Sequence, residues 1–271
     1  MIDLRCGDCL ELMKNIPSNT IDCVITSPPY DNLREYNNND LWNFDKFKKV
    51  AEHLYRVLKS GGIIVWIVSD QTIKGSETGT SFKQALYFKE IGFNIHDTMI
   101  WEKPTFTDVA SLKVRYAQVF EYMFIFSKGK PKTFNPIKDK LNTTFGSKIH
   151  GTIRLPNGET KPMNNIGKEI KQFGQRHNVW KLNTECSNKE RKHPAQFPIK
   201  LVHDHIITWT NKNDIVLDCF MGSGTTGVAC KELERKFIGI EIDNDYFNTA
   251  KERIENSLIQ EKLNLEKNEN E

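Results

Sequence analysis

The sequence of 271 residues contains no apolar run that approaches the roughly 20 residues of a membrane span. Its start lacks the basic and apolar regions of a secretory signal. It has six cysteines, of which Cys6 and Cys9 have C-x-x-C spacing, but no second pair completes a zinc site. We therefore expect a cytoplasmic protein with reduced thiols, no metal centre and no membrane partner.

Net charge is also small, but it is unevenly distributed. The whole chain carries +3. Residues 128–192 hold twelve lysines and three arginines against five acids, a local charge of +10, so the remainder carries −7. A basic segment inside an acidic frame is typical of a lobe that binds a polyanion. A solvated, lysine-rich insertion is the alternative.

The most informative motif is Thr26-Ser27-Pro28-Pro29-Tyr30, which follows the apolar run 21–25. The run predicts a buried strand, and two prolines prevent a ladder or helix from continuing. Ligands bind at this end of the strands in open α/β sheets. The extended backbone before a proline would hold the carbonyls of Ser27 and Pro28 outward, as acceptors for an amino group. Tyr30 could stack on the ring that carries this group; a Pro-Pro turn with a core tyrosine is the alternative.

A second motif lies near the other end of the chain. Residues 214–220 predict a buried strand, 221–227 a tight glycine-rich turn, 228–235 a helix and 237–241 another strand. This is one βαβ unit with the shape of a nucleotide site, and its glycines let a ligand approach the backbone.

The acids of this unit indicate which nucleotide it binds. Glu241, at the end of the second strand, could accept hydrogen bonds from two ribose hydroxyls. Asp218, just before the turn, would repel a pyrophosphate but could hold a cationic amino acid. S-adenosylmethionine therefore suits the unit better than NAD, although an NAD-dependent oxidoreductase stays open as a remote alternative.

Between the two motifs, strands alternate with helices, which predicts a largely parallel sheet covered on both faces. Beyond Leu258 the sequence is polar, and we expect it to fray. Further helices are expected at 44–58 (ended by Gly61-Gly62), 82–91 and 199–208, and further strands at 63–68, 93–101 and 122–126.

Both motifs, in this order, resemble those of the amino-methylating DNA methyltransferases of the β arrangement, found in restriction-modification systems. The resemblance covers nearly the whole chain. It implies an α/β class I S-adenosylmethionine-dependent methyltransferase fold: a mostly parallel seven-stranded sheet, circularly permuted in motif order, with one antiparallel strand near an edge and a small basic recognition lobe.

The resemblance also implies a domain plan and partners. Residues 1–127 would form the catalytic half, 128–192 the target recognition region, 193–258 the cofactor-binding half and 259–271 a polar tail. S-adenosyl-L-methionine would be the cofactor and double-stranded DNA the partner. A cognate restriction endonuclease would be a candidate genetic partner, with the enzyme a monomer or homodimer.

Site residues follow by matching motif positions. The expected catalytic residues are Ser27, Pro28, Pro29 and Tyr30. The expected cofactor-binding residues are Asp8, Thr26, His193, Pro194, Asp218, Phe220, Gly222, Ser223, Gly224, Thr225 and Glu241. The candidate DNA contacts are Arg34, Tyr36, Arg154, Arg176 and Lys181, for which ordinary surface positions are the alternative.

The resemblance points to methylation of an exocyclic amino group. Carbon-5 methylation of cytosine usually needs a Pro-Cys pair, and none of the six cysteines follows a proline. Serine at the position of Ser27 mostly accompanies cytosine N4 in the family, whereas aspartate or asparagine mostly accompanies adenine N6. We therefore expect a cytosine-N4 enzyme that flips its target base, with adenine N6 as the alternative.

Overall fold

The computed structural model describes residues 1–29, 42–104, 110–183 and 197–268. The chain divides into two compact units: Met1–Asn135 with Asn178–Glu271, and Pro136–His177. The smaller unit is shorter than the recognition region 128–192 expected from sequence. No helix in the described part is long and apolar enough to cross a membrane.

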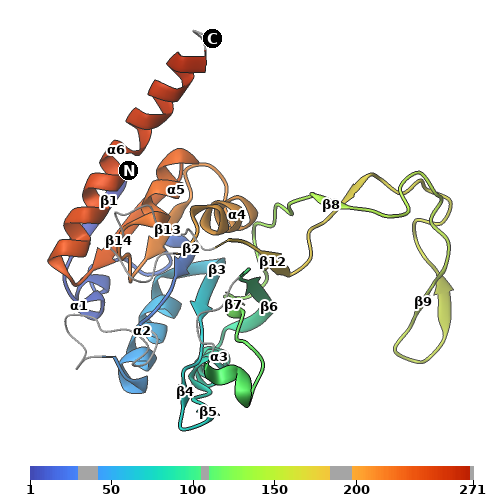
Figure 1. The fold of residues 1–271 in the computed structure, drawn as a ribbon, viewed down its shortest axis with the longest axis horizontal. Coiled ribbons are helices and arrows are strands. Elements are labelled where there is room, and N and C mark those ends of the chain that lie inside the picture. The colour runs from blue at the N-terminus through green and yellow to red at the C-terminus, as the bar shows by residue number, and fades with distance from the viewer. Residues whose placement is uncertain (30–41, 105–109, 184–196, 269–271) are drawn as a thin grey trace. The chain divides into compact units, whose positions relative to one another are not determined.

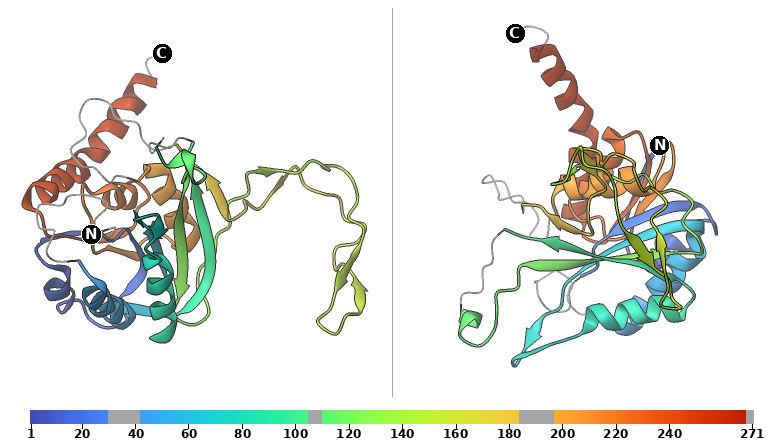
Figure 2. Two further views of the ribbon diagram at one scale, coloured as in Figure 1. Left: turned by 60° about the horizontal axis from the view of Figure 1, so that its bottom comes forward. Right: turned by 90° about the vertical axis from the view of Figure 1, so that its right-hand side faces the viewer.

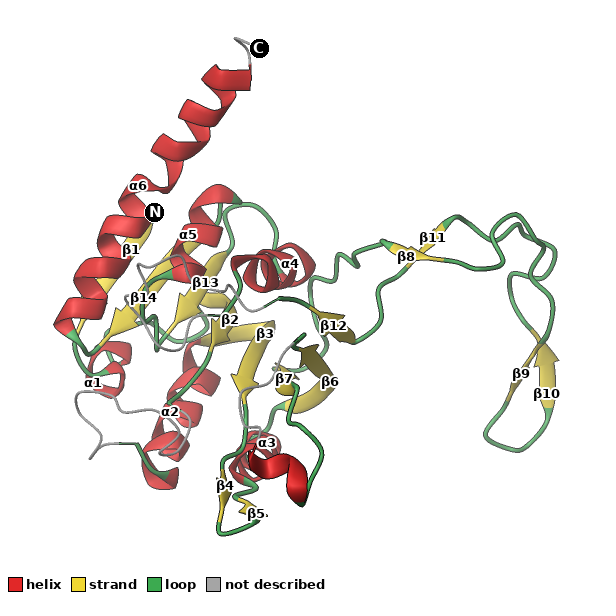
Figure 3. Ribbon diagram, in the orientation of Figure 1, coloured by secondary structure: helices red, strands yellow, loops and turns green. Residues whose placement is uncertain are grey.

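The larger unit is built on one large sheet (Figures 1 and 3) with the strand order β1-β14-β13-β2-β3-β7-β6-β12. A separate short ribbon in this unit pairs β4 (Thr72–Ile73) with β5 (Ser76–Glu77). Among the described strands of this sheet, β7 alone runs antiparallel to its neighbours, as expected for one strand near an edge. The strands are β1 (Ile2–Cys6), β2 (Ile21–Thr26), β3 (Leu58–Val68), β6 (Asn94–Glu102), β7 (Phe120–Ser127), β12 (Val179–Lys181), β13 (Ile215–Asp218) and β14 (Lys236–Glu241).

In the described part of the chain the sheet has eight strands, one more than the seven expected. The additional strand is β12, which lay inside the expected recognition region. It pairs in parallel with β6, with Trp180 opposite Trp101. Trp180 is buried, and burial of its indole explains why this part of the basic segment belongs to the sheet.

Both faces of the sheet are covered by helices, as the two views of Figure 2 show. Along β3, Ile64, Trp66 and Val68 pack with the first three helices, whereas Ile63, Val65 and Ile67 pack with the last three. Burial on both faces accounts for the continuous apolar run of this strand. The helices are α1 (Cys9–Met13), α2 (Phe44–Val57) and α3 (Thr80–Glu90) on one face, and α4 (Ile199–Trp209), α5 (Thr225–Glu232) and α6 (Asn244–Asn268) on the other.

Two expected boundaries were wrong. Gly61-Gly62 does not end α2, which stops at Val57 and leads directly into β3, so the glycines lie inside that strand. Gly61 takes a φ of 79°, and an added Cβ would come within 2.9 Å of Lys132. The last helix, α6, continues to Asn268, through the residues beyond Leu258 that were expected to fray.

Lys128, counted with the basic segment, caps the end of α2. Its Nζ donates to the carbonyls of Tyr55 at 2.7 Å and Leu58 at 2.9 Å, and to the side chain of Asn19 at 2.9 Å. A cation at the carboxyl end of a helix is favourable because it compensates the helix dipole. The charge of Lys128 therefore stabilises the larger unit.

The smaller unit consists of short antiparallel ribbons: β8 (Lys140–Leu141) with β11 (Phe173–Gly174), and β9 (Thr152–Arg154) with β10 (Thr160–Pro162). Nearly all of its residues are exposed. It carries six lysines and two arginines against three acids, a net charge of +5.

Candidate active site

The candidate catalytic motif begins where β2 ends. The parallel ladder with β3 reaches Thr26, which lies opposite Trp66. The next residues are half-buried Ser27, buried Pro28 and half-buried Pro29. The prolines end the strand, as the sequence predicts, and place the motif at the carboxyl edge of the sheet. Tyr30, Arg34 and Tyr36 lie outside the described residues.

Asp218, the last residue of the neighbouring strand β13, lies against this motif. Its Oδ1 accepts hydrogen bonds from the Thr26 hydroxyl at 2.6 Å and the Phe220 amide at 3.1 Å. Its Oδ2 accepts from the Thr226 hydroxyl at 2.7 Å. The side chain is only 1% exposed. Burial raises the pKa of Asp218 to about 6, although hydrogen bonds from Thr226, Thr26 and Phe220 oppose the rise.

The glycine-rich turn follows directly and leads into α5. Gly222 and Gly224 take φ values of 53° and 82°, in the left-handed region that favours glycine. A Cβ on Gly224 would come within 2.8 Å of the Cβ of Ala250 on α6. Arg253, also on α6, donates to the Ser223 carbonyl at 2.6 Å and to its hydroxyl at 2.9 Å. The contacts of Gly224 with Ala250 and of Ser223 with Arg253 thus hold the loop tightly against α6.

Glu241, at the end of β14, faces the same loop. Its Oε2 accepts from the Gly222 amide at 2.8 Å and its Oε1 from the Asp243 amide at 2.9 Å. Burial raises the pKa of this carboxyl, which is 9% exposed, against the two backbone bonds that lower it. Each oxygen keeps a further lone pair, so a preorganised acceptor for two hydroxyls fits this position.

Asp8 lies beside Glu241 because β1 and β14 are neighbours. Cys6 pairs with Glu241, and the Gly7 amide donates to the Glu241 carbonyl at 2.8 Å. Asp8 is the N-cap of α1, and its Oδ1 accepts from the Leu10 amide at 2.8 Å. Asp8, expected to bind the cofactor, and Glu241, expected to bind its ribose, thus lie at adjacent strand ends.

An aromatic pair adds an apolar wall that the sequence did not predict. The ring of half-buried Phe220 lies edge-on to Trp42, with centroids 5.1 Å apart. Thr225, the first residue of α5, is buried. His193 and Pro194, expected to bind the cofactor, lie outside the described residues.

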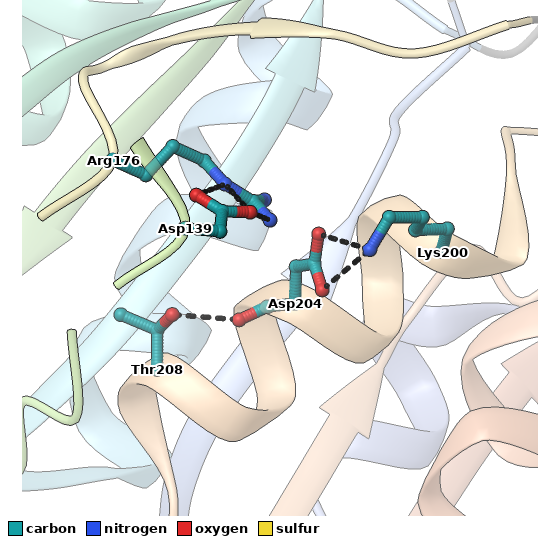
Figure 4. Close-up of polar contacts among 5 residues, drawn as sticks. All are labelled: Asp139, Arg176, Lys200, Asp204 and Thr208. Carbon is teal, nitrogen blue, oxygen red and sulfur yellow. Dashed lines mark hydrogen bonds and ion pairs between the residues drawn. The ribbon is translucent and has the colours of Figure 1, made fainter. Parts of the chain in front are cut away.

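The candidate DNA contacts have different surroundings. Arg154 is exposed on β9. Arg176 pairs with Asp139 within the smaller unit (Figure 4), its Nε 3.1 and 3.0 Å from the two carboxylate oxygens. Lys181 lies on β12 of the larger unit and forms an ion pair of 3.0 Å with Glu102. The structure therefore does not bring these three residues together on one element.

Three residues of the site were missed by sequence reasoning: Thr226, Trp42 and Arg253. Thr226 stands within the glycine-rich motif, so its hydroxyl next to Asp218 was a usable signal. Trp42 and Arg253 give no local signal, because their partners are distant in sequence.

The permuted sheet, glycine loop and ribose-type acid define a class I S-adenosylmethionine-dependent methyltransferase. A family model described as DNA methylase matches residues 21–252. The chain belongs to this family of N6/N4 amino-methyltransferases, which act on DNA and use S-adenosylmethionine. It is a methyltransferase of the restriction-modification type, and nothing supports the oxidoreductase alternative.

Named relatives agree. The orphan methyltransferase M.BamHII of Bacillus amyloliquefaciens is 49% identical over 92% of this chain and 94% of its own length. The structure of the PvuII DNA methyltransferase (cytosine-N4-specific) matches with a TM-score of 0.69 and 24% identity, over 92% of this chain and 84% of that one. The M1.HpyAVI–SAM complex matches with a TM-score of 0.64 and 29% identity, over 94% and 99%.

Proposed function

We propose that this protein transfers a methyl group from S-adenosylmethionine to the exocyclic N4 amino group of a flipped cytosine in duplex DNA. The observation that carries the proposal is the position of Ser27-Pro28-Pro29. This segment directly follows β2, and Thr26 joins it to the cofactor loop through a 2.6 Å hydrogen bond to Asp218.

The chemistry depends on making a weak nucleophile reactive. An exocyclic amino nitrogen is a poor nucleophile because its lone pair is delocalised into the ring. The Ser27 hydroxyl and the Pro28 carbonyl accept hydrogen bonds from the amino group, which favours a pyramidal nitrogen. S-adenosylmethionine supplies a methyl group on a positively charged sulfur. The nitrogen forms a bond to the methyl carbon, the C–S pair stays on sulfur, and the nitrogen releases one proton to water.

Binding of the cofactor follows from the acids and the loop. Glu241 accepts from the ribose hydroxyls and Asp8 from the adenine amino group, next to the wall formed by Phe220. The backbone of residues 222–225 contacts the rest of the ligand. Support comes from the left-handed glycines and from the lone pairs that Glu241 retains. His193 and Pro194 hold the methionine end.

Base choice rests on Ser27. In the resembling enzymes serine at this position accompanies cytosine, and the alternative is adenine N6. A target inside a duplex must leave the stack to react, and Tyr30 is placed in sequence to stack on it.

The identity of the base is tested by nucleoside mass spectrometry of unmethylated plasmid DNA after treatment with the protein. We expect N4-methylcytosine; N6-methyladenine would establish the alternative, and no methylated nucleoside would refute the proposal. Replacing Pro29 with alanine should abolish transfer and leave cofactor binding nearly intact. Loss of both would argue against a catalytic position for this residue.

Recognition of DNA is assigned to the smaller unit, with β9 and β10 as the reading ribbon. Arg154 pairs with Thr160, and Thr152 pairs with Pro162, so these four residues share one face. The opposite face carries Ile153 and its partner Lys161. A two-stranded ribbon fits the major groove, and an isolated hairpin is only marginally stable without a partner. The net charge of +5 favours duplex DNA as that partner.

Arg154 is the proposed base contact on this ribbon, because its guanidinium has no bond to other described residues. Arg154→Ala should relax sequence preference and cost about 1–3 kcal/mol in binding the cognate site. The matched control is Lys171→Ala, which removes an exposed charge of the same unit. It should weaken binding to all sequences alike and lower the salt slope by about one. Unchanged sequence preference in the Arg154 variant would refute this assignment. Because Arg176 and Lys181 already form ion pairs with acids, they are proposed as weaker contacts.

A further inference from the structure

The link between the two halves of the site is a single buried carboxylate. Asp218 ends β13, Thr26 ends β2 and Thr226 lies in the first turn of α5. The two hydroxyls donate to different oxygens of the carboxylate, at 2.6 and 2.7 Å. Both threonines are fully buried. Elements from the two ends of the chain, β2 on one side and β13 with α5 on the other, therefore meet at one acid.

The surroundings of Asp218 argue against direct contact with a ligand. A carboxylate that binds the ammonium of an amino acid needs an oxygen directed toward it. Here Oδ1 already accepts from Thr26 and the Phe220 amide, Oδ2 accepts from Thr226, and only 1% of the residue is exposed.

The backbone alone does not fix the two motifs to each other. The ladder between β13 and β2 consists of Val216 opposite Cys23 and Leu217 opposite Val24. The ladder has no further pair toward the carboxyl ends of these two strands. The hydroxyl–carboxylate–hydroxyl bridge continues the connection through side chains at the point where the backbone ladder stops.

We infer that Asp218 is a positioning residue that does not contact the cofactor, and that Thr226 holds it so that Thr26, and with it Ser27 and Pro28, is fixed relative to the cofactor loop. The inference rests on the proposed function. In-line methyl transfer requires the nitrogen, methyl carbon and sulfur to be aligned closely, and small misplacements are costly in rate. The bridge joins the element that orients the nitrogen to the element that orients the sulfur.

The bridge also has a pH signature. The titratable groups whose charge interacts with Asp218 are Glu241 on β14, Cys219 beyond β13 and Cys230 on α5. Burial raises the pKa of both thiols well above the ordinary value, so they stay neutral near pH 7. The hydroxyl bonds lower the pKa of Asp218, so removing either threonine hydroxyl should raise it further.

The test uses Thr226→Val, Thr26→Val and the double variant, which remove hydroxyls with little change in shape. Two quantities are measured: the dissociation constant of S-adenosylmethionine by calorimetry, and the single-turnover rate of methyl transfer to duplex DNA at saturating cofactor. We expect each single variant to lose about tenfold in rate, as for one buried hydrogen bond to a charged group. Cofactor affinity should change by less than about threefold.

The double variant separates a shared bridge from two unrelated effects. Because both hydroxyls act through one carboxylate, its rate loss should be smaller than the product of the single losses. The acidic limb of the pH–rate profile should move to higher pH in each variant. An affinity loss equal to the rate loss would show direct cofactor contact and overturn the inference. The inference would also be overturned if the rate loss of the double variant equalled the product of the single losses and the pH–rate profile did not move.

Thr208→Val is the matched control, because this buried hydroxyl donates only within its own helix, to the Asp204 carbonyl (Figure 4). It should keep the wild-type rate, and an equal loss there would refute a specific bridge. Thr226→Ser keeps the hydroxyl that Thr226→Val removes, so its rate should stay near that of the wild type. The coupling between the two hydroxyls is also measured in urea unfolding of the same variants, which requires no methyl transfer. An inactive wild-type protein would refute the proposed function. Shifts of the urea midpoint that simply add in the double variant would refute the bridge.

Discussion

Replacing Asp218 with asparagine should stabilise the protein at neutral and alkaline pH. The carboxylate is buried, and burial raises its pKa from 3.8 to about 6. The folded state therefore binds this proton more tightly than the unfolded chain does. The contribution to the free energy of unfolding is present below the unfolded pKa and is lost as pH rises through the folded one.

The size of the effect follows from the shift. A rise of roughly two pKa units corresponds to about 3 kcal/mol of preference for the protonated form in the folded protein. Asparagine resembles the protonated acid in shape and charge. Its amide oxygen can accept from Thr26, and its amide nitrogen can donate to the Thr226 hydroxyl, which rotates to accept. The bridge thus keeps its bonds while the buried charge is removed.

The assay is urea unfolding of wild type and Asp218→Asn across a pH series. The two proteins should be about equally stable near pH 4, and the variant should gain up to about 3 kcal/mol by about pH 8. Other acids titrate in both proteins, so the difference isolates Asp218. A difference that does not vary with pH would show that Asp218 keeps one charge state, and would refute the reasoning.

Two other substitutions test the cofactor side of the site. Glu241→Gln should weaken S-adenosylmethionine binding about ten- to a hundredfold in calorimetry, because an NH2 group replaces a charged acceptor that faces a backbone amide. Glu234→Gln, on an exposed acid paired with a lysine, should leave affinity unchanged; equal losses would remove Glu241 from the site. Gly224→Ala should cost about 2–4 kcal/mol in urea unfolding, because it adds strain at φ 82° to a 2.8 Å approach to Ala250. Gly75→Ala, at φ 83° in open space, should cost only about 1 kcal/mol. A similar cost at both glycines would contradict the packing argument.

Local sequence was sufficient for the elements that end at the site. The apolar run before Thr26 and the prolines after it make a strand that must stop there. Gly222 and Gly224 predict a tight turn, because glycine adopts the left-handed backbone conformation of these positions without strain. These are short-range effects of backbone sterics and burial, so the residues that cause them are adjacent in the chain.

The errors share a physical origin in long-range contacts. Gly61-Gly62 has the pattern of a helix end, but the backbone of Gly61 packs against Lys132 and so stays inside β3. Residues 179–181 lie in a basic, loop-rich stretch, yet the exposed edge of β6 provides a partner for them and Trp180 is buried there. How much such a pairing stabilises a segment depends on which strand lies next to it, and the local sequence pattern does not contain this information.

By itself, the sequence predicted most strands and helices of the larger unit, both motifs and, through their resemblance, the class of reaction. Only the tertiary structure decided how the motifs are joined. Thr26 and Asp218 stand 192 positions apart, and their hydrogen bond exists because β2 and β13 are neighbours in the sheet. A strand's local pattern favours burial on both faces without specifying which strand lies next to it. That choice of neighbour places Asp218, an acid expected to bind the cofactor, between the hydroxyls of two threonines.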